Sequence, residues 1–306
     1  MLQPEGISIP LSPRPPEPSN PKRLYANLAG VEVGDDFPVR LIGAINVSRE
    51  SFYPGSVAHG KRALQKLAAQ MVKDGADILD IGAMSTAPYL TGTISEEQEA
   101  ERMVAAVGAV RQVTGVPISA DTQRSRVAAA ALKAGASIIN DVSGLGQDHA
   151  MAKVARQAEG VILMALEQSP SAAAPITMIA SLLRQCLQRA RGAGIARDHI
   201  VLDPGIGFFR RAALPWYEFD SLVLARLSHL RRLGYPLLVG ISRKSFIGKL
   251  AGRATAEERL HGSLGAAAIA VYNGAAVVRT HDVAATLDAV RVAEAIREKH
   301  PPPRSR

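Results

Sequence analysis

The sequence predicts an α/β fold, a single-domain (β/α)8 barrel of the TIM type, from three observations. Short apolar runs alternate with longer amphipathic runs, eight apolar runs are present, and the series fits the roughly 250 residues typical of this barrel. A doubly wound open sheet would also alternate, but it usually has fewer strands and often a Gly-rich dinucleotide-binding turn after the first. The first apolar run here is followed by NVSRESFYPGS, which contains no such turn. These observations favour the barrel.

Each predicted strand is a short apolar run. In chain order the runs are VRLIGAINV (39–47), ADILDIGA (76–83), VPISADT (116–122), ASIINDVSG (136–144), GVILMALE (160–167), HIVLDPGIGF (199–208), YPLLVGISR (235–243) and AAVVRTHDV (275–283). In a barrel of this type the C-terminal ends of the strands carry the active site. The residues that follow each run are therefore the candidate functional residues.

The segments between these runs are predicted to be helices, because their apolar residues recur at i, i+3 and i+4. Clear examples are HGKRALQKLAAQMVKDGA, SEEQEAERMVAAVGAVRQVTG and RSRVAAAALKAGA. Several of the helical patterns end at a glycine, as a helix C-cap often does, at Gly75, Gly135 and Gly194. Strand and helix signals thus agree on the same alternation.

The two ends of the chain differ from this core. Residues 1–36 begin with the Pro-rich MLQPEGISIPLSPRPPEPSNPKR, which has no basic-then-apolar signal pattern, and we expect them to form a flexible lead-in. Residues 300–306 are similar, and we expect a disordered tail. The predicted barrel domain therefore covers residues 37–299.

Composition excludes several classes of protein. No apolar run approaches the roughly 18 residues needed to cross a bilayer. Cys186 is the only cysteine, so no intrachain disulfide can form, and its helical surroundings predict a buried, inert thiol. The net charge is +8, but aromatics are only 4% and no Lys/Arg run is interleaved with them, which argues against nucleic acid binding. We expect a cytoplasmic protein whose positive charge serves small anionic substrates, phosphates above all.

Polar side chains gather at the predicted C-terminal ends of the strands. They are Asn46, Asp80, Ser85, Thr86, Asp121, Asn140, Asp141, Asp203, Arg243, Lys244, Arg279, His281 and Asp282. One such residue would mean little, but seven of the eight strands end this way. Together they predict an active site at this face.

Four of these residues suit a flat heterocycle with donors and acceptors on its edge. Asp121 and Asp203 can each accept two N–H groups of an amino-pyrimidinone, and Asn140 can match a mixed edge. Lys244 can donate to a ring carbonyl or nitrogen while its stem lies over the ring. The sequence contains no Cys/His cluster that would make the carboxylates part of a metal cage.

Simpler structural roles are open for the same side chains. Asp203 precedes a Pro-Gly pair and could cap a turn. Asp121 stands just before a helix that begins near Gln123 and could be its N-cap. Asn140 and Asp141 could form a turn.

A second group suits a phosphate or diphosphate. Arg279 and His281 alternate along the eighth strand, so both side chains point to the same side, beside the loops where such barrels most often bind phosphate. Arg279 could instead form a structural ion pair with a nearby acid. Asn46 faces them from the first strand and could bind a diphosphate-bound Mg²⁺. With no obvious covalent nucleophile, we infer displacement of a diphosphate with electrostatic stabilisation, carried by Lys244, Arg279 and Asp203.

These segments resemble the dihydropteroate synthase family, over about residues 38–298. The matching segments are INVSRESF (45–52), GADILDIGAMST (75–86), ISADT (118–122), IIND (138–141), LDPGIGF (202–208), VGISRKSFIG (239–248), ERLHGSLGAAA (258–268) and RTHDV (279–283). The resemblance implies that an arylamine nitrogen attacks the methylene of 6-hydroxymethyl-7,8-dihydropterin diphosphate and releases diphosphate, with Mg²⁺ present. It also implies a homodimer that associates through outer helices.

By position, the resemblance assigns the pterin to Asp121, Asn140, Asp203 and Lys244, and the diphosphate and metal to Asn46, Arg279 and His281. It places Thr86, Phe208 and Ser245 on the arylamine side, where we also expect Arg210. Arg243 is expected to brace the end of its strand. The carboxylate, amide and cationic groups that the family uses for the pterin and the diphosphate thus fall on the residues that the strand ends had already indicated.

The departures from the family pattern cluster around the arylamine. Ala87 stands where the folate enzymes carry an Arg, and Phe209-Arg210 replaces a Gly-Lys pair. These loops look similar to archaeal-type members linked to tetrahydromethanopterin synthesis, which implies a ribofuranosyl-aminobenzene phosphate in place of 4-aminobenzoate. Arg49, Arg210 and Arg211 would then be partners for the added phosphate, or else ordinary solvated charges.

Two other functions are compatible with a pterin-binding barrel. One is methyl transfer from tetrahydrofolate to a corrinoid, but that reaction has no need of the diphosphate group of residues. The other is a catalytically inactive pterin-binding paralogue, which the departures in the loops would allow. Against it, Asn46, Lys244, Arg279 and His281 are all present.

Overall fold

The computed structural model describes residues 23–47, 60–84, 94–166 and 173–299. Eight parallel strands form the core, in the spatial order β8-β7-β6-β5-β4-β3-β10-β9. They are β3 (Arg40–Asn46), β4 (Ile78–Gly82), β5 (Ile118–Asp121), β6 (Ile138–Asp141), β7 (Gly160–Met164), β8 (Ile200–Asp203), β9 (Leu238–Gly240) and β10 (Val277–Thr280). All eight lie within the predicted apolar runs, which confirms the strand prediction.

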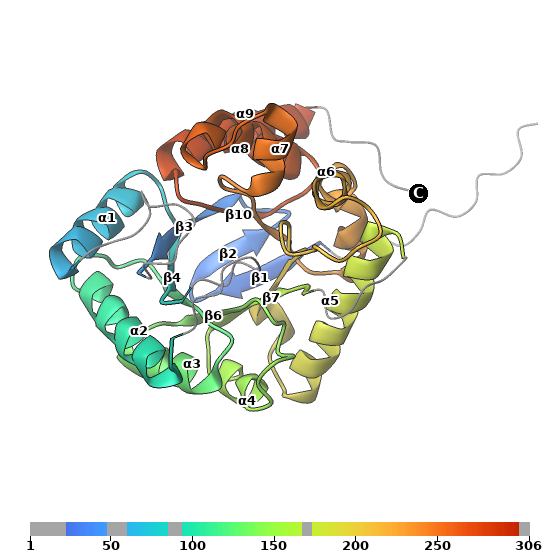
Figure 1. The fold of residues 1–306 in the computed structure, drawn as a ribbon. Coiled ribbons are helices and arrows are strands. Elements are labelled where there is room, and N and C mark those ends of the chain that lie inside the picture. Colours follow the sequence, from blue (N-terminus) through green and yellow to red (C-terminus); the bar gives the residue numbers. More distant parts are fainter. Residues whose placement is uncertain (1–22, 48–59, 85–93, 167–172, 300–306) are drawn as a thin grey trace, which may run out of the picture.

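The sheet closes on itself between its two end strands. Leu202 of β8 bridges to Leu237, just before β9, and the Leu202 N–H donates to the Pro236 carbonyl at 3.0 Å. Helices surround the strands as a ring (Figure 1). They are α1 (Lys61–Lys73), α2 (Glu96–Arg111), α3 (Ser125–Ala134), α4 (Met151–Ala155), α5 (Pro175–Gly192), α6 (Trp216–Ala225), α7 (Ser245–Ala251), α8 (Leu260–Tyr272) and α9 (Val283–Lys299). The predicted (β/α)8 barrel is confirmed.

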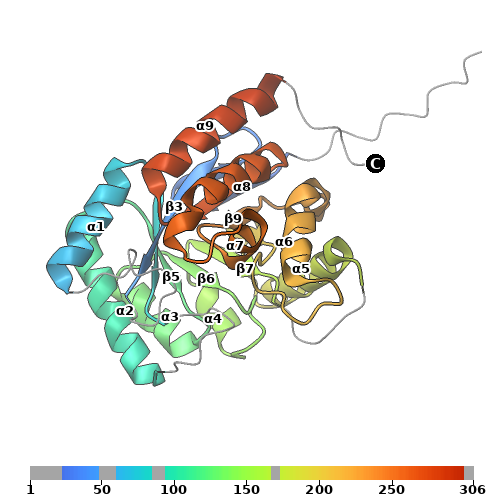
Figure 2. The same cartoon turned by 45° about the horizontal axis from the view of Figure 1, so that its top comes forward.

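Local sequence explains where several helices begin and end. Ser95 and Gln98 form a capping box at the start of α2, and α5 begins with Pro175, whose missing N–H costs nothing there. Gly135 ends α3 in the left-handed conformation that glycine adopts easily. In Figures 1 and 2, α8 and α9 lie side by side over β10. Within the described part of the chain, each helix is too short or too polar to serve as a membrane span.

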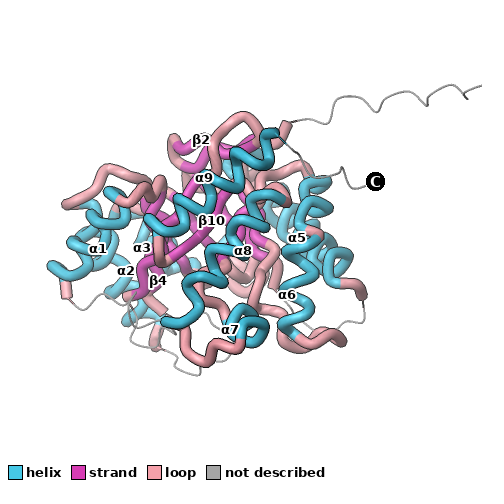
Figure 3. Tube along the Cα trace, turned by 90° about the horizontal axis from the view of Figure 1, so that it is seen from above, coloured by secondary structure: helices cyan, strands magenta, loops and turns pink. Residues whose placement is uncertain are grey.

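One prediction about the N-terminal segment is wrong for residues 25–34. These residues form an antiparallel hairpin of β1 (Tyr25–Leu28) and β2 (Val31–Gly34). Ala26, Leu28 and Val33 are fully buried against the inward-facing residues at the N-terminal ends of the barrel strands. Figure 3 shows the hairpin at the end of the barrel opposite α7. Residues 1–22 and 300–306, the rest of the predicted lead-in and the tail, lie outside the described residues.

The physical reason for this difference is burial that only the barrel provides. A four-residue apolar stretch cannot fold alone, but here it closes an open apolar end of the strand layer. The fit is close: a Cβ on Gly160 would lie 2.8 Å from Leu28 Cδ2. The predicted burial of Cys186 is confirmed, and that burial raises the pKa of its thiol.

Candidate active site

Four polar residues from different strands meet inside the C-terminal mouth of the barrel. Asp80 of β4, Asp121 of β5, Asn140 of β6 and Asp203 of β8 are all buried. Asp121 pairs in register with Asn140, and the Asn140 amide donates to Asp80 Oδ2 at 3.2 Å. Three of these residues were predicted to hold a heterocycle. The barrel brings them together as expected.

Arg279 of β10 reaches across the mouth to two of these carboxylates. Its Nε donates to Asp80 Oδ2 at 2.6 Å and its Nη2 donates to Asp121 Oδ2 at 3.1 Å. The structural ion pair considered from the sequence is therefore present. About 20% of the Arg279 side chain stays exposed.

Burial sets the protonation behaviour of these acids. The pKa of Asp121 rises to about 7 because of desolvation and the negative charge of Asp80, which the Arg279 charge only partly offsets. Desolvation likewise raises the pKa of Asp203 to about 6, although the hydrogen bond from the Gly205 N–H and the positive charge of Lys244 act to lower it. Among the described residues, Asp80 Oδ1 and Asp121 Oδ1 are buried and accept no hydrogen bond. Unsatisfied buried acceptors are costly, so these atoms suit a ligand that brings N–H donors.

The alternative roles can now be assigned. Asp203 does cap its turn, because its Oδ1 accepts from the Gly205 N–H at 2.8 Å. Asp141 is a turn former, with both oxygens accepting backbone N–H groups of the following loop, from Ser143 and Leu145. Asp121 is not a helix cap: α3 begins after Arg124. Asp121 is thus free for a role in the mouth.

Lys244 extends along the rim of the mouth from the start of α7. Its Nζ donates to the Ile206 carbonyl at 2.5 Å and lies 4.5 Å from the centre of the Phe208 ring. Desolvation lowers the pKa of Lys244 to about 8, although Asp203 and Asp220 oppose this shift. Gly207 makes room for the lysine stem: its φ is 85°, and an added Cβ would lie 2.7 Å from Lys244 Cδ.

Asp220 of α6 is a site residue that the sequence reasoning missed. It is fully buried, and its Oδ1 accepts from the Gly207 N–H at 2.9 Å, which holds the turn beneath Lys244. Desolvation raises the pKa of Asp220 to about 6. Asp80 was noted at its strand end but given no role. An acid inside an apolar strand or on the apolar face of a helix was the signal available for both.

Two of the residues predicted to bind diphosphate, Asn46 and His281, lie beside each other at the ends of β3 and β10. Asn46 Nδ2 and His281 Nε2 are 3.2 Å apart, and His281 Nδ1 lies 3.0 Å from Ser242 Oγ. Desolvation and the nearby cations lower the pKa of His281 to about 3, so the imidazole is neutral at physiological pH. The predicted proximity of Asn46 to the eighth barrel strand is confirmed.

Of the residues predicted to lie on the arylamine side, Arg210 and Ser245 are in contact. Arg210 Nη2 donates to Ser245 Oγ at 2.9 Å, and its guanidinium lies 4.3 Å from the centre of the Trp216 ring. Phe208 is half-buried beside Lys244, while the adjacent Phe209 is buried and stacks on Phe219 at 4.7 Å. Thr86, Ala87 and Arg49 lie outside the described residues.

The described residues contain no group of three His, Cys, Asp or Glu side chains that could hold a metal ion. Asn46, the residue predicted to hold a diphosphate-bound Mg²⁺, lies beside His281 and supplies one side-chain oxygen. A Mg²⁺ ion that arrives with a diphosphate takes most of its ligands from phosphate and water, so a single amide oxygen fits such an ion.

Comparison with known proteins identifies related chains. Residues 42–281 match the family model described as pterin binding enzyme. The dihydropteroate synthase of Neisseria meningitidis serogroup B is 40% identical over 280 residues, covering 87% of this chain and 95% of the relative. The expected resemblance to an archaeal branch finds no support here, because the named relatives are bacterial enzymes.

Solved structures of dihydropteroate synthases have the same fold as this chain. A dihydropteroate synthase from Coxiella burnetii in complex with pteroic acid superposes with a TM-score of 0.80 at 32% identity, covering 90% of this chain and 99% of the other. The enzyme from Xanthomonas albilineans with 4-aminobenzoic acid superposes with a TM-score of 0.78 at 34% identity, with the same two coverages of 90% and 99%.

Proposed function

The chain belongs to the pterin-binding enzyme family, and from this premise we propose that it acts as a dihydropteroate synthase in folate biosynthesis. It joins 6-hydroxymethyl-7,8-dihydropterin diphosphate to 4-aminobenzoate. The amine nitrogen forms a bond to the pterin methylene carbon, the bond from that carbon to the diphosphate oxygen breaks, and the amine loses a proton. Diphosphate is the leaving group.

The observation that carries this proposal is the pair of unsatisfied carboxylate oxygens in the mouth. Asp80 Oδ1 and Asp121 Oδ1 are buried and, within the described residues, accept no hydrogen bond, while their Oδ2 atoms are held by Arg279. A pterin edge carries amino and ring N–H groups that can satisfy such acceptors. Asn140 lies beside them to match a mixed donor and acceptor edge, and Lys244 reaches from the rim to the ring.

The leaving group is assigned to the other side of the mouth. His281 is neutral, so it brings a polar group without a full positive charge to this side of the mouth, and Arg279 supplies the charge. Both groups are held before substrate arrives, which is the condition for electrostatic stabilisation of a departing anion. Asn46 would hold the Mg²⁺ that neutralises the diphosphate.

The second substrate is proposed to be 4-aminobenzoate. Arg210 is held by Ser245 and stacked on Trp216 at the side of the mouth next to Phe208, where a planar carboxylate can pair with its guanidinium. The phosphorylated ribofuranosyl derivative expected from the loop sequence would use the same cation. The supporting fact for the simpler amine is that the Xanthomonas relative was solved with 4-aminobenzoic acid.

A homodimer is also proposed, through the outer helices that follow the last barrel strands. Leu250 of α7, Ile269 of α8, and Val292 and Ile296 of α9 are each at least half exposed. Large apolar side chains exposed on neighbouring helices are typical of a protein interface. Sedimentation analysis of the wild type and of Ile269→Glu tests this, since the charge should shift the protein to monomer.

The test of function is diphosphate release by the purified protein with the pterin diphosphate and Mg²⁺, offered 4-aminobenzoate or its ribofuranosyl phosphate derivative in parallel. We expect turnover with 4-aminobenzoate. Turnover with the phosphorylated amine alone would move the protein to a methanopterin-type pathway. Tight pterin diphosphate binding without turnover on either amine would instead identify an inactive paralogue.

A further inference from the structure

Arg243 occupies an unusual position beside the proposed site. It is buried, yet it is a non-glycine residue with a φ of 55°, in the left-handed region that side chains with a Cβ rarely adopt. It stands between Ser242 and Lys244, which both face the mouth. Such conformations persist only where surrounding contacts hold them, and they often mark functional sites.

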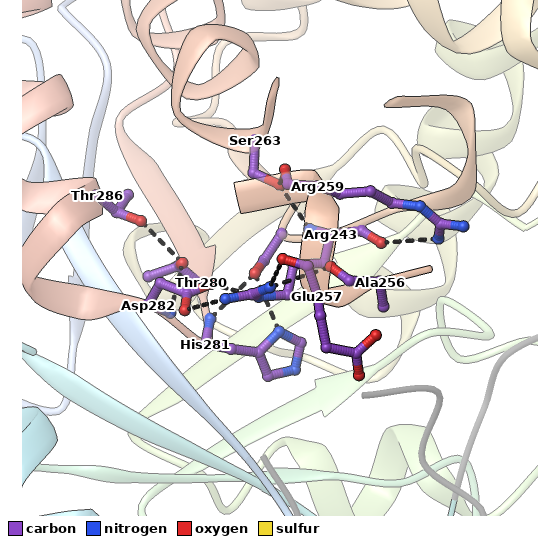
Figure 4. A network of polar contacts seen from close by, with 10 residues as sticks. Arg243, Ala256, Glu257, Arg259, Ser263, Thr280, His281, Asp282 and Thr286 are labelled. Atoms are coloured by element: carbon purple, nitrogen blue, oxygen red, sulfur yellow. Dashed lines mark hydrogen bonds and ion pairs between the residues drawn. The ribbon is translucent and has the colours of Figure 1, made fainter. Parts of the chain in front are cut away.

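The contacts that hold Arg243 come from three separate segments (Figure 4). Its Nε and Nη2 donate to the two carboxylate oxygens of Asp282 at 2.8 and 2.7 Å. Its Nη1 donates to the carbonyls of Ala256 and Glu257 at 3.0 and 2.8 Å, and its backbone N–H donates to Ser263 Oγ at 2.8 Å. We call Arg243, Asp282 and these two carbonyls the Arg243 clasp.

The clasp joins the ends of β9 and β10 at the place where His281 is held. Ser242 Oγ accepts the His281 backbone N–H at 3.3 Å and lies 3.0 Å from the ring Nδ1. Asp282 follows His281 directly, and its N–H donates to Thr280 Oγ1 at 3.1 Å. His281 is therefore bounded by Ser242 on one side and Asp282 on the other, and the Arg243 to Asp282 pair fixes the spacing between them.

Lys244 depends less on the clasp. Although it follows Arg243 in the chain, its ammonium group is held by the Ile206 carbonyl and lies against the Phe208 ring. Both of these contacts come from the segment after β8. Loss of the clasp should thus affect the two neighbouring functional groups unequally.

We propose that the Arg243 clasp is a positioning device for the diphosphate-binding His281, and that Arg243 and Asp282 act on the leaving group through that imidazole without touching substrate. This inference rests on the proposed function. It predicts that loss of the clasp weakens binding of the diphosphate and leaves recognition of the pterin ring nearly intact.

The experiment measures binding by isothermal titration calorimetry for two ligands, the pterin diphosphate with Mg²⁺ and the same dihydropterin without its diphosphate. For Asp282→Asn we expect the affinity for the first to fall by about 10- to 100-fold, by analogy with the loss when an outer-shell partner of a metal-binding histidine is removed. Affinity for the second should change by less than about threefold. Asp35→Asn is the matched control, because it breaks the 2.7 Å Arg231–Asp35 pair next to the hairpin.

A second readout separates positioning from general stability. If the clasp acts through His281, the double variant Asp282→Asn/His281→Ala should bind the pterin diphosphate no worse than His281→Ala alone. Additive losses, or equal losses for both ligands, would overturn the proposal. If Asp282→Asn does not fold, Arg243→Lys replaces it. Lysine keeps the positive charge but cannot make the paired hydrogen bonds of the guanidinium to Asp282, and the same binding comparisons then test the proposal.

The same titrations distinguish failure of the proposed function from failure of the clasp proposal. Wild type that binds neither ligand would refute the pterin site itself. Wild type that binds both, with Asp282→Asn indistinguishable from it, would refute the clasp alone.

Discussion

Replacement of Asp121 by Asn should weaken pterin binding strongly without destabilising the protein. In the folded chain, Asp121 Oδ1 is buried and accepts no hydrogen bond from the described residues, while Oδ2 accepts from Arg279. A hydrogen bond to a charged acceptor contributes about 1.5–3 kcal/mol. The loss of one such bond to a pterin N–H therefore lowers affinity by about 10- to 150-fold.

The free energy of unfolding, in contrast to the pterin affinity, should rise slightly or stay unchanged in this variant. Burial raises the pKa of Asp121 from 3.8 to about 7, so its contribution to the free energy of unfolding is full below about pH 4 and is lost as the pH rises through about 7. Asn carries no charge and removes the repulsion with Asp80, and Arg279 keeps its 2.6 Å bond to Asp80. Above pH 7 the variant should be at least as stable as the wild type.

The pH dependence of binding gives a second signature. Only the ionised Asp121 accepts two N–H donors, so wild-type affinity for the dihydropterin should rise between about pH 6 and pH 8. Asp121→Asn should lose this rise.

The assay is calorimetric titration with the dihydropterin at several pH values, together with urea unfolding monitored by circular dichroism. Asp77→Asn is the control, because Asp77 pairs with Arg40 away from the mouth. The reasoning is refuted if Asp121→Asn binds the pterin within about threefold of wild type, under about 0.7 kcal/mol. It is also refuted if the variant is markedly less stable at pH 8.

Three further outcomes are expected. Gly207→Ala puts a Cβ 2.7 Å from Lys244 Cδ at a φ of 85°, so it should raise KM for the pterin diphosphate and cost about 1–3 kcal/mol of stability, which steady-state kinetics and urea unfolding would measure. Leu28→Ala removes a fully buried side chain from the hairpin and should lower the free energy of unfolding by about 2–5 kcal/mol, with pterin affinity in calorimetry unchanged. Arg210→Ala should raise KM for 4-aminobenzoate by more than KM for the pterin diphosphate, because Arg210 contacts Ser245 on the arylamine side; equal changes would contradict that assignment.

The barrel could be predicted from the sequence because the patterns that mark its strands and helices lie within short stretches of the chain. Each strand is an apolar run of a few residues and each helix repeats its apolar positions within two turns, so both can be recognised without knowledge of their partners. The hairpin of β1 and β2 could not be recognised in this way. Its four-residue strands have too little apolar surface to predict burial, and they are stable only against the open end of the barrel.

For the site, the sequence by itself determined which residue types stand at the strand ends, since chain order places Asp121, Asn140 and Lys244 directly after apolar runs. Only the tertiary structure decided which of them interact. Arg279 and Asp80 are 199 residues apart in the chain, and they can form an ion pair because β10 and β4 both pair with β3. The same holds for Asp220: its place on the apolar face of a helix marks it as unusual, but only the fold shows that its partner is the Gly207 N–H of the turn beneath Lys244. The residue type alone sets charge and polarity. Burial, pairing and the pKa shifts that follow depend on which distant segments the fold brings into contact.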